Sequence, residues 1–130
     1  MIKKIKLRKY IKKSGTLIPL EFNKKIPIKV KRIFYIYGKK NYIRADHAHK
    51  KCTQVFVPIL GKIKLSYINK KSAGEKILNY KKKEIFLLKP YNWCRVKFIS
   101  NNAILMVICD RHYEQKDYIE TYSDFLKFIK

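Results

Sequence analysis

The sequence predicts an all-β protein, a sandwich or barrel of short strands that is followed by one C-terminal helix. Apolar and polar residues alternate along many short segments, which is the period of a strand with one buried face. Turn residues such as Gly61 separate these segments, and the spacing of apolar residues becomes helical near the C-terminus. Many short strands with regular turns are typical of β-sandwiches and barrels.

Alternation identifies the strand candidates in chain order. It is clearest at Val55, Val57 and Ile59, and it returns at residues 63–67, with Gly61 placed where a tight hairpin needs a permissive backbone. All the candidates together are residues 17–21, 26–37, 55–59, 63–67, 77–80, 84–88, 95–99 and 103–109.

The C-terminal stretch follows a different period. Its apolar residues recur at spacings of one, three and four, which lines one helical face; they are Tyr118, Ile119, Tyr122, Phe125, Leu126 and Ile129. We expect a helix that packs its apolar side against the outside of the barrel and has a structural role.

The composition fits one folded domain over residues 1–130. A chain of this length can bury one packed core, and 47% hydrophobic residues exclude a disordered class. No repeat, low-complexity linker or Pro/Gly/Ser-rich boundary divides the chain.

The net charge of +23 by itself favours binding to polyanions. However, only five of the 32 basic residues are arginine, and the lysines are scattered over the whole length. Proteins that read nucleic-acid sequence rely on arginine for bidentate contacts. We therefore expect a solvated basic surface and no nucleic-acid partner, and a nucleic-acid-binding β-barrel stays open as an alternative outside the enzyme classes.

Cysteine usage and the N-terminus indicate the compartment. Cys52, Cys94 and Cys109 are far apart and odd in number, so neither a disulfide framework nor a structural zinc site is indicated. The basic N-terminus lacks the apolar run of a signal peptide, and no segment approaches the length of a membrane span. We expect a cytoplasmic protein with reduced thiols and no membrane partner.

The chemistry concentrates in residues 37–61. Residues two apart in a strand point to the same face, so His47 and His49 project together while Ala48 points away. With Gln54 and Gly61 at the spacing that follows, this segment resembles the first motif of the cupins, which implies a jelly-roll barrel.

The same motif departs from metal-binding cupins at one position. Gln54 stands where they carry Glu, and a neutral amide is a poor ligand for a hard or borderline cation. The region of the second cupin motif, residues 89–98, contains Pro90 and Trp93 but no histidine. We therefore expect no metal and no other cofactor, because two imidazoles fall short of the usual three protein ligands.

Paired imidazoles without a metal are suited to moving protons near neutral pH. Arg44 and Arg32 flank the motif and could stabilise an oxyanion or clamp a diphosphate. Tyr35 and Tyr37 share one face of their expected strand, so either could reach the same pocket.

At this point the chain resembles the sugar nucleotide 3,4-ketoisomerases. That family moves the carbonyl of dTDP-4-keto-6-deoxyglucose from C4 to C3, toward 3-amino sugars of surface glycans such as lipopolysaccharide. The runs that carry the resemblance are GTLIPLEF (15–22), IPIKVKRIFYIYG (26–38), RADHAHKKCTQV (44–55), Trp93 within PYNW, and HYEQKDYIETYSDFL (112–126).

The resemblance implies roles for the histidines and a homodimeric assembly. His47 would take the C3 proton, and His49 would relay a proton toward C4. The family usually shows Arg-Gly-x-His-Ala-His, whereas this chain has Ala45 and Asp46 before His47. Alanine restricts the backbone there, and we expect Asp46 to face away from the histidines.

The resemblance also implies the walls of the site. Tyr37 and Arg44 would line the sugar pocket as catalytic residues, and Arg32 would hold the nucleotide phosphate or a sugar oxygen. Gln54 and Trp93 would complete the wall, with Tyr35 as a further substrate-binding candidate. Two related alternatives stay open: a sugar nucleotide 3,5-epimerase, and a sensory cupin that binds the sugar nucleotide without turnover.

Overall fold

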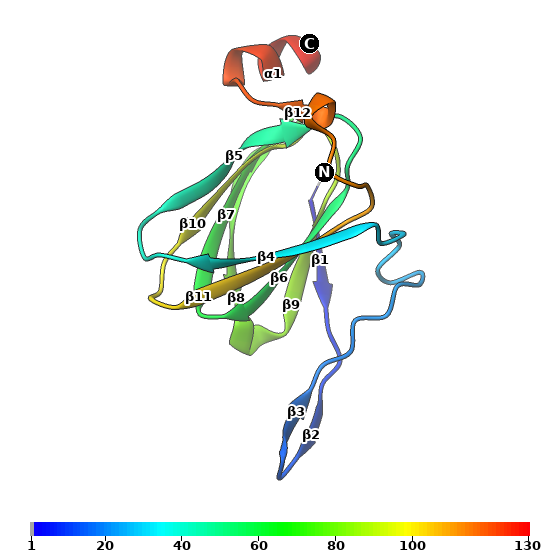
Figure 1. Cartoon of the computed structure of the whole chain (residues 1–130), viewed down its shortest axis with the longest axis vertical. Coiled ribbons are helices and arrows are strands. Elements are labelled where there is room, and N and C mark those ends of the chain that lie inside the picture. Colours follow the sequence, from blue (N-terminus) through cyan, green and yellow to red (C-terminus); the bar gives the residue numbers. More distant parts are fainter. Residues whose placement is uncertain (1) are drawn as a thin grey trace.

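The computed structural model describes residues 2–130, which form two five-stranded antiparallel sheets packed face to face as a jelly-roll-like sandwich (Figure 1). The first sheet has the order β1 (Ile2–Lys6), β9 (Glu84–Leu88), β6 (Gln54–Leu60), β11 (Ala103–Cys109) and β4 (Arg32–Gly38). The second has the order β12 (Tyr118–Ile119), β5 (Ile43–His49), β10 (Trp93–Phe98), β7 (Lys62–Ile68) and β8 (Ala73–Asn79). The predicted all-β jelly-roll class is therefore confirmed.

The main core lies between the two sheets. Ile63 and Leu65 of β7 and Leu105 and Val107 of β11 point into it and are at most 1% exposed. Burial of such a side chain contributes roughly 1.5–3 kcal/mol. The alternation seen in the sequence is thus the alternation between this core and the opposite face of each sheet.

A second apolar cluster covers the outer face of the first sheet. Val55 and Val57 of β6 pack there against Ile26, which belongs to the irregular segment before β4. Because both faces of β6 are covered, five consecutive residues from Gln54 are buried.

The irregular segment, residues 18–31, corrects two of the expected strands. The strand expected at 26–37 begins only at Arg32, and of the one expected at 17–21 only Leu17 lies in a strand. Pro19 and Pro27 cannot donate to a strand ladder, and the apolar residues alternate because the segment covers a sheet without joining one. The other expected strands are found, with bounds shifted by a few residues.

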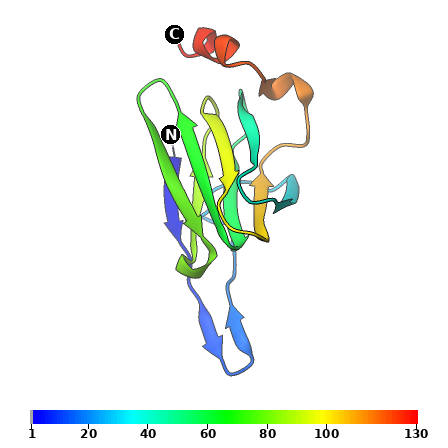
Figure 2. The same cartoon turned by 90° about the vertical axis from the view of Figure 1, so that its left-hand side faces the viewer.

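Apart from Leu17, the three N-terminal strands were not expected from the sequence. The lysine-rich β1 pairs with β9, and only Ile5 of its residues is fully buried. Next, β2 (Tyr10–Lys12) and β3 (Gly15–Leu17) form an arm that projects from the sandwich (Figures 1 and 2). Its apolar side chains Ile11 and Leu17 are 68% and 61% exposed.

Gly61 lies between β6 and β7, as expected for the hairpin. Its φ is +76°, and a Cβ at this position would lie 3.0 Å from the Ala103 Cα. Two short 3-10 helices, η1 (Tyr80–Lys82) and η2 (Gln115–Asp117), complete the connections. Within residues 2–130, no helix is both long enough and apolar enough to cross a membrane.

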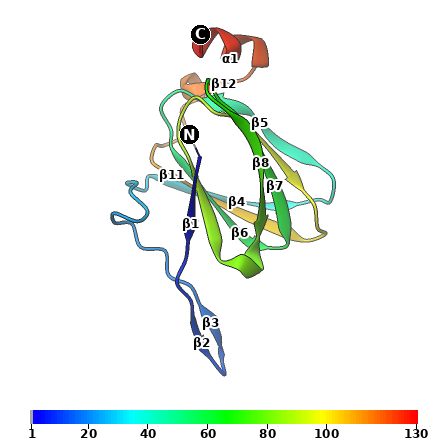
Figure 3. The same cartoon turned by 180° about the vertical axis from the view of Figure 1, so that it is seen from behind.

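The C-terminal helix α1 (Tyr122–Phe128) begins later than expected, because Tyr118 and Ile119 pair with β5 as strand β12. The Thr121 hydroxyl accepts a hydrogen bond from the Asp124 N–H and caps the helix. Phe125 is fully buried against Ala48 and other outward residues of the second sheet, so the expected packing of the helix is confirmed. Figure 3 shows α1 beside β12 at one end of the sandwich.

Candidate active site

A cavity of about 440 Å³ opens between the two sheets beside the edge strand β4. Its walls come from strands of both sheets and from the segment that leads into β12. Apolar side chains form much of the lining, among them Phe34, Phe56, Val96, Leu105 and Val107, and the polar members are Arg32, Arg44, His47, Gln54, Tyr113 and Tyr118. A few polar groups in an apolar cavity are typical of small-molecule sites.

The two histidines of the motif lie side by side, as their spacing predicted. The rings of His47 and His49 meet edge to face with centroids 5.1 Å apart, and Tyr118 contacts both rings. Ala48 points to the opposite face, where it is buried under α1. His47 lines the cavity, and His49 is almost fully buried behind it.

Asp117 is a functional candidate that the sequence analysis missed. Its Oδ2 lies 2.8 Å from His49 Nδ1, and its carboxylate also accepts the backbone N–H of Lys51 at 2.6 Å and of Cys52 at 3.3 Å. A carboxylate that accepts from Nδ1 orients a histidine and leaves Nε2 as its free acceptor. Within residues 2–130, His49 Nε2 is buried and has no hydrogen-bond partner.

Burial sets the protonation state of this pair. Burial, with the nearby His49, lowers the pKa of His47 to about 4. Burial also lowers the pKa of His49, and the hydrogen bond and charge of Asp117 only partly offset that effect. For Asp117, burial alone would raise the pKa, but hydrogen bonds from His49 and from backbone N–H groups outweigh it and hold the pKa below its ordinary value. Both imidazoles are therefore neutral at neutral pH, which is the form that can accept a proton.

Arg32 places a fixed positive charge at the cavity. Its guanidinium donates to the Tyr118 hydroxyl at 3.3 Å and to Cys109 Sγ at 3.8 Å. It also lies over the rings of Phe34 and Tyr113, at 5.1 and 5.5 Å from their centroids. A guanidinium held in this way is arranged to receive an anionic group.

Gln54 belongs to the same network. It is buried, and its Nε2 donates to Cys109 Sγ at 3.8 Å. Hydrogen bonds from Cys52, Arg32 and Gln54 lower the pKa of Cys109 to about 6, although burial opposes them. The sulfur therefore acts as an acceptor that anchors both Arg32 and Gln54.

The structure brings most of the site residues expected from the sequence together. Arg32, Arg44, His47 and Gln54 line the cavity, and His49 contacts His47 directly. Tyr35 borders the cavity, but its side chain is 62% exposed and lies with Tyr37 on the outer face of β4.

Tyr37 and Trp93 differ from the expectation, because they lie outside the cavity lining. Tyr37 follows the inward Ile36 and therefore points to the outer face of β4, where it is 73% exposed. Its ring contacts the ring of Tyr35 on that face. Trp93 alternates with the inward Cys94 and packs under α1 against Phe125.

The sequence analysis gave no site role to Tyr113 and Tyr118, which line the cavity, or to Asp117 behind it, although all three lie in the run 112–126 that carries the family resemblance. Tyr118 was assigned to a helical face, whereas it lies in β12 and turns its ring toward the histidines. Asp117 contacts a residue 68 positions earlier in the chain, and no local pattern encodes such a contact.

One group of described side chains has ligand types that suit a metal ion. Ligand atoms of His49, Cys52 and Asp117 lie within 4.8 Å of one another. Three N–H groups already use the Asp117 oxygens as acceptors. This donor set is typical of a carboxylate that orients a histidine, and it fits a metal ion poorly.

Comparison with known proteins gives a consistent assignment. Residues 1–130 match the family model described as FdtA: WxcM-like, C-terminal. A relative from Aneurinibacillus thermoaerophilus, named TDP-4-oxo-6-deoxy-alpha-D-glucose-3,4-oxoisomerase, is 32% identical over 128 residues, which cover 98% of this chain and 91% of the relative.

Solved structures agree in fold over almost the whole chain. A 3,4-ketoisomerase from Helicobacter canadensis superimposes with a TM-score of 0.92 at 29% identity, covering 98% of this chain and 96% of that one. A mutant of the 3,4-ketoisomerase QdtA from Thermoanaerobacterium thermosaccharolyticum, in complex with TDP-4-keto-6-deoxyglucose, gives 0.92 at 26% identity and covers 99% and 94%. The chain therefore belongs to the FdtA, WxcM-like family, that of the sugar nucleotide 3,4-ketoisomerases.

Proposed function

We propose that this protein isomerises TDP-4-keto-6-deoxyglucose by moving the carbonyl from C4 to C3. The observation that carries the proposal is a neutral His47 at the wall of the cavity, backed by His49 and Asp117. The relative from A. thermoaerophilus is named for this reaction, and the chain covers nearly all of its length.

The reaction needs a base, a proton donor and charge stabilisation. A neutral imidazole removes the proton from C3. The electron pair of the broken C3–H bond then forms a C3–C4 double bond, and the C4 carbonyl oxygen becomes an oxyanion. A proton then returns to C4, and the C4 oxyanion takes up a second proton to become a hydroxyl, as the C3 hydroxyl loses its proton and becomes the carbonyl. Hydrogens and electrons balance within the sugar, so the isomerisation consumes no redox partner.

The histidine pair can divide these proton transfers. His47 faces the cavity and is placed to take the C3 proton. His49 has its Nδ1 fixed by Asp117 and its Nε2 free, so it can pass a proton on toward C4.

The two arginines of the cavity supply the positive charge. Arg32 is anchored by Tyr118 and Cys109 and suits the diphosphate or the developing oxyanion, and Arg44 reaches the same cavity from β5.

The test is to incubate the protein with TDP-4-keto-6-deoxyglucose in deuterated water and to follow the sugar by NMR. We expect a 3-keto sugar with deuterium at C4. His47→Asn should abolish the conversion, His49→Asn should reduce it strongly, and His112→Asn is the matched control because His112 is exposed and outside the cavity.

Other patterns of deuterium would contradict parts of the proposal. Deuterium at C3 and C5 with an unmoved C4 carbonyl would indicate an epimerase. If His47→Asn still exchanges the C3 proton while His49→Asn does not, the roles of the two histidines are reversed. An untouched sugar that nevertheless binds would indicate a sensory protein.

We further propose that the protein works as a homodimer in the cytoplasm, on a pathway to sugars of surface glycans. The open edge strand β4 exposes Ile33, Tyr35 and Tyr37, and the projecting arm exposes Ile11 and Leu17, so a second copy would cover apolar surface and an edge strand. The three cysteines are free buried thiols, which suits a reducing compartment. Light scattering on the purified protein should give twice the mass of 15.7 kDa, and a monomer would contradict the dimer.

A further inference from the structure

Strand β5 contains a one-residue bulge next to the catalytic pair. In its pairing with β10, His47 lies opposite Cys94 but Ala45 lies opposite Arg95, so Asp46 has no partner in the ladder. Ala45 and Asp46 have φ values of +70° and +62°, in the left-handed region that favours glycine. Two consecutive strained residues persist only where the surrounding contacts hold them.

The bulge decides which side chains of β5 reach the cavity. Arg44 and His47 are three residues apart and would point to opposite faces of a regular strand. The extra residue shifts the alternation by one, so that Arg44 lies opposite the inward Val96 and His47 opposite the inward Cys94. Both Arg44 and His47 therefore line the cavity.

A single carboxylate ties this bulge to β10 on the outer face of the sheet. The Trp93 indole N–H donates to Asp46 Oδ1 at 3.0 Å. The Arg95 guanidinium donates to both oxygens, from Nε at 3.1 Å and from Nη2 at 3.2 Å. Planar two-pronged pairing of this kind fixes direction as well as distance.

Trp93 and Arg95 hold the Asp46 carboxylate in different ways. Trp93 fixes its position, because the indole is itself immobile, while Arg95 mainly fixes its orientation. The indole is buried under α1, with ring centroids 5.8 Å from Phe125 and 5.5 Å from Tyr122. Arg95 and Asp46 are about half exposed, and ion pairs at such positions add little to stability. The contact is therefore better suited to holding geometry than to stabilising the fold.

We propose that Asp46 is a positioning residue that fixes which side chains of β5 face the cavity. Through Trp93 and Arg95 it keeps the bulge in place. The bulge in turn lets Arg44 and His47 face the same substrate. This inference rests on the proposed ketoisomerase function.

The variants are Asp46→Ala, which removes all three contacts, and Asp46→Asn, which keeps an acceptor for the indole but loses the charge. Trp93→Phe removes the N–H donor and keeps an aromatic ring, although a smaller one, under α1. Glu75→Ala is the matched control, because it breaks an ion pair of similar exposure, Lys64–Glu75 at 3.2 Å, between β7 and β8 of the same sheet.

We expect Asp46→Ala to lower kcat by about tenfold or more, since small displacements of catalytic groups are costly. Asp46→Asn and Trp93→Phe should lie between it and the wild type. The Tm of Asp46→Ala should change no more than that of Glu75→Ala. The Kd for TDP should rise by a smaller factor than kcat falls, because Arg32, which Tyr118 and Cys109 anchor, lies outside the bulge and only Arg44 lies next to it.

A second measurement is independent of turnover. In ¹H–¹⁵N spectra, the His47 imidazole signals, assigned with His47→Asn, should shift or broaden in Asp46→Ala and stay unchanged in Glu75→Ala. This readout distinguishes the two proposals, because it applies even if the wild type leaves the keto sugar untouched.

Two results would overturn the positioning role. One is an Asp46→Ala protein with wild-type kcat and wild-type His47 signals. The other is a loss of activity that is matched by a large drop in Tm and a loss of TDP binding, which would make Asp46 a structural residue only.

Discussion

His47 faces the cavity in surroundings that oppose its protonation. Burial and the neighbouring His49 lower its pKa to about 4. A base works only in its deprotonated form, so activity is lost as the pH falls through the pKa of the folded protein and is kept above it.

We therefore expect kcat/KM to stay level from about pH 8 down to about pH 5, and to fall only as the pH approaches 4. The measurement is kcat/KM against pH, with circular dichroism at each pH to show that the protein remains folded. An acid limb at the ordinary histidine value of about 6.5 would contradict this environment of His47.

Asp117 affects the same proton transfers indirectly, by orienting His49. Replacing it by Asn removes the negative charge and presents N–H groups toward the N–H groups of Lys51 and Cys52. We expect Asp117→Asn to reduce kcat by about 100-fold or more, because the tautomer of His49 is no longer fixed.

The same variant should change the pH dependence of stability. A carboxyl group whose pKa is lowered by folding contributes stability at neutral pH that is lost as the pH falls. The urea midpoint of the wild type should decline on acidification more steeply than that of Asp117→Asn. An equal slope would show that the carboxylate is not stabilised in the folded state.

At the scale of the element, Phe125 is the one buried residue of α1. Phe125 is fully buried against Ala48, Trp93 and Ile119, on the outer side of β5 and β10. Removing a buried phenylalanine costs about 3–5 kcal/mol where the site cannot collapse. The neighbouring Leu126 is 43% exposed.

Phe125→Ala should lower the free energy of unfolding by about 3 kcal/mol, and Leu126→Ala by less than about 1 kcal/mol. Chemical denaturation followed by circular dichroism gives both values. Equal effects of the two substitutions would mean that α1 does not pack through Phe125.

Strands could be predicted from the sequence where one face is buried. The strands β7, β10 and β11 alternate between the core and the opposite face, and that alternation is local information. Residues 26–31 show the same alternation but lie across a sheet, because a covering segment also buries every second side chain. The lysine-rich β1 was missed for the opposite reason, since its pairing with β9 leaves only Ile5 fully buried.

The candidate site was predictable to the extent that its residues share one strand. His47 and His49 follow from a spacing of two. The bulge at Asp46 depends on the register with β10, and the approach of Asp117 depends on where the chain returns after β11. Neither is encoded in neighbouring residues, so both needed the three-dimensional structure.

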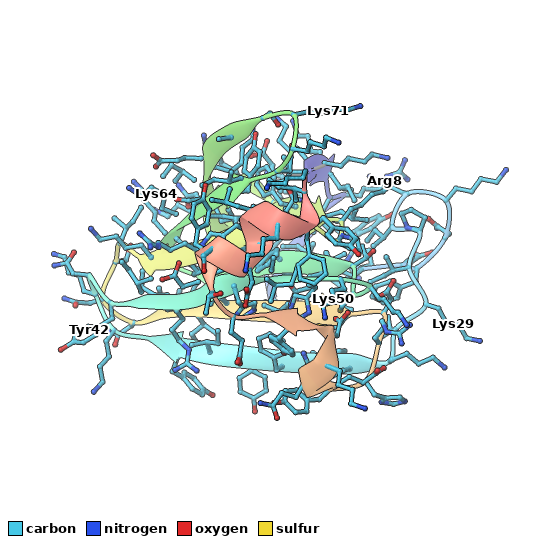
Figure 4. The ribbon with its side chains drawn as sticks, turned by 90° about the horizontal axis from the view of Figure 1, so that it is seen from above. Arg8, Lys29, Tyr42, Lys50, Lys64 and Lys71 are labelled. Atoms are coloured by element: carbon cyan, nitrogen blue, oxygen red, sulfur yellow. The ribbon has the colours of Figure 1, made fainter. Side chains whose placement is uncertain are left out.

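At the scale of the whole molecule, the dominant property is the net charge of +23. The basic residues lie on many sides: Arg8, Lys29, Lys64 and Lys71 are spread around the molecule in Figure 4, and Lys50 lies near the middle of that view. Such a distribution attracts anions from all directions without specifying a sequence or a shape. It favours fast encounter with a TDP-sugar, whose diphosphate is negatively charged.

Added salt should therefore slow the encounter of the protein with its TDP-sugar without changing the rate of the chemical step. Exposed charges are screened over about 10 Å at 0.1 M salt and over about 3 Å at 1 M. As NaCl rises from about 0.05 to about 0.5 M, we expect kcat/KM for the TDP-sugar to fall several-fold while kcat stays constant, because the proposed site is a cavity with largely apolar walls. The Tm should rise over the same range, since repulsion among the lysines is screened. If kcat/KM stays flat, the surface charge does not guide the substrate, and binding depends only on the local charges of Arg32 and Arg44 at the cavity.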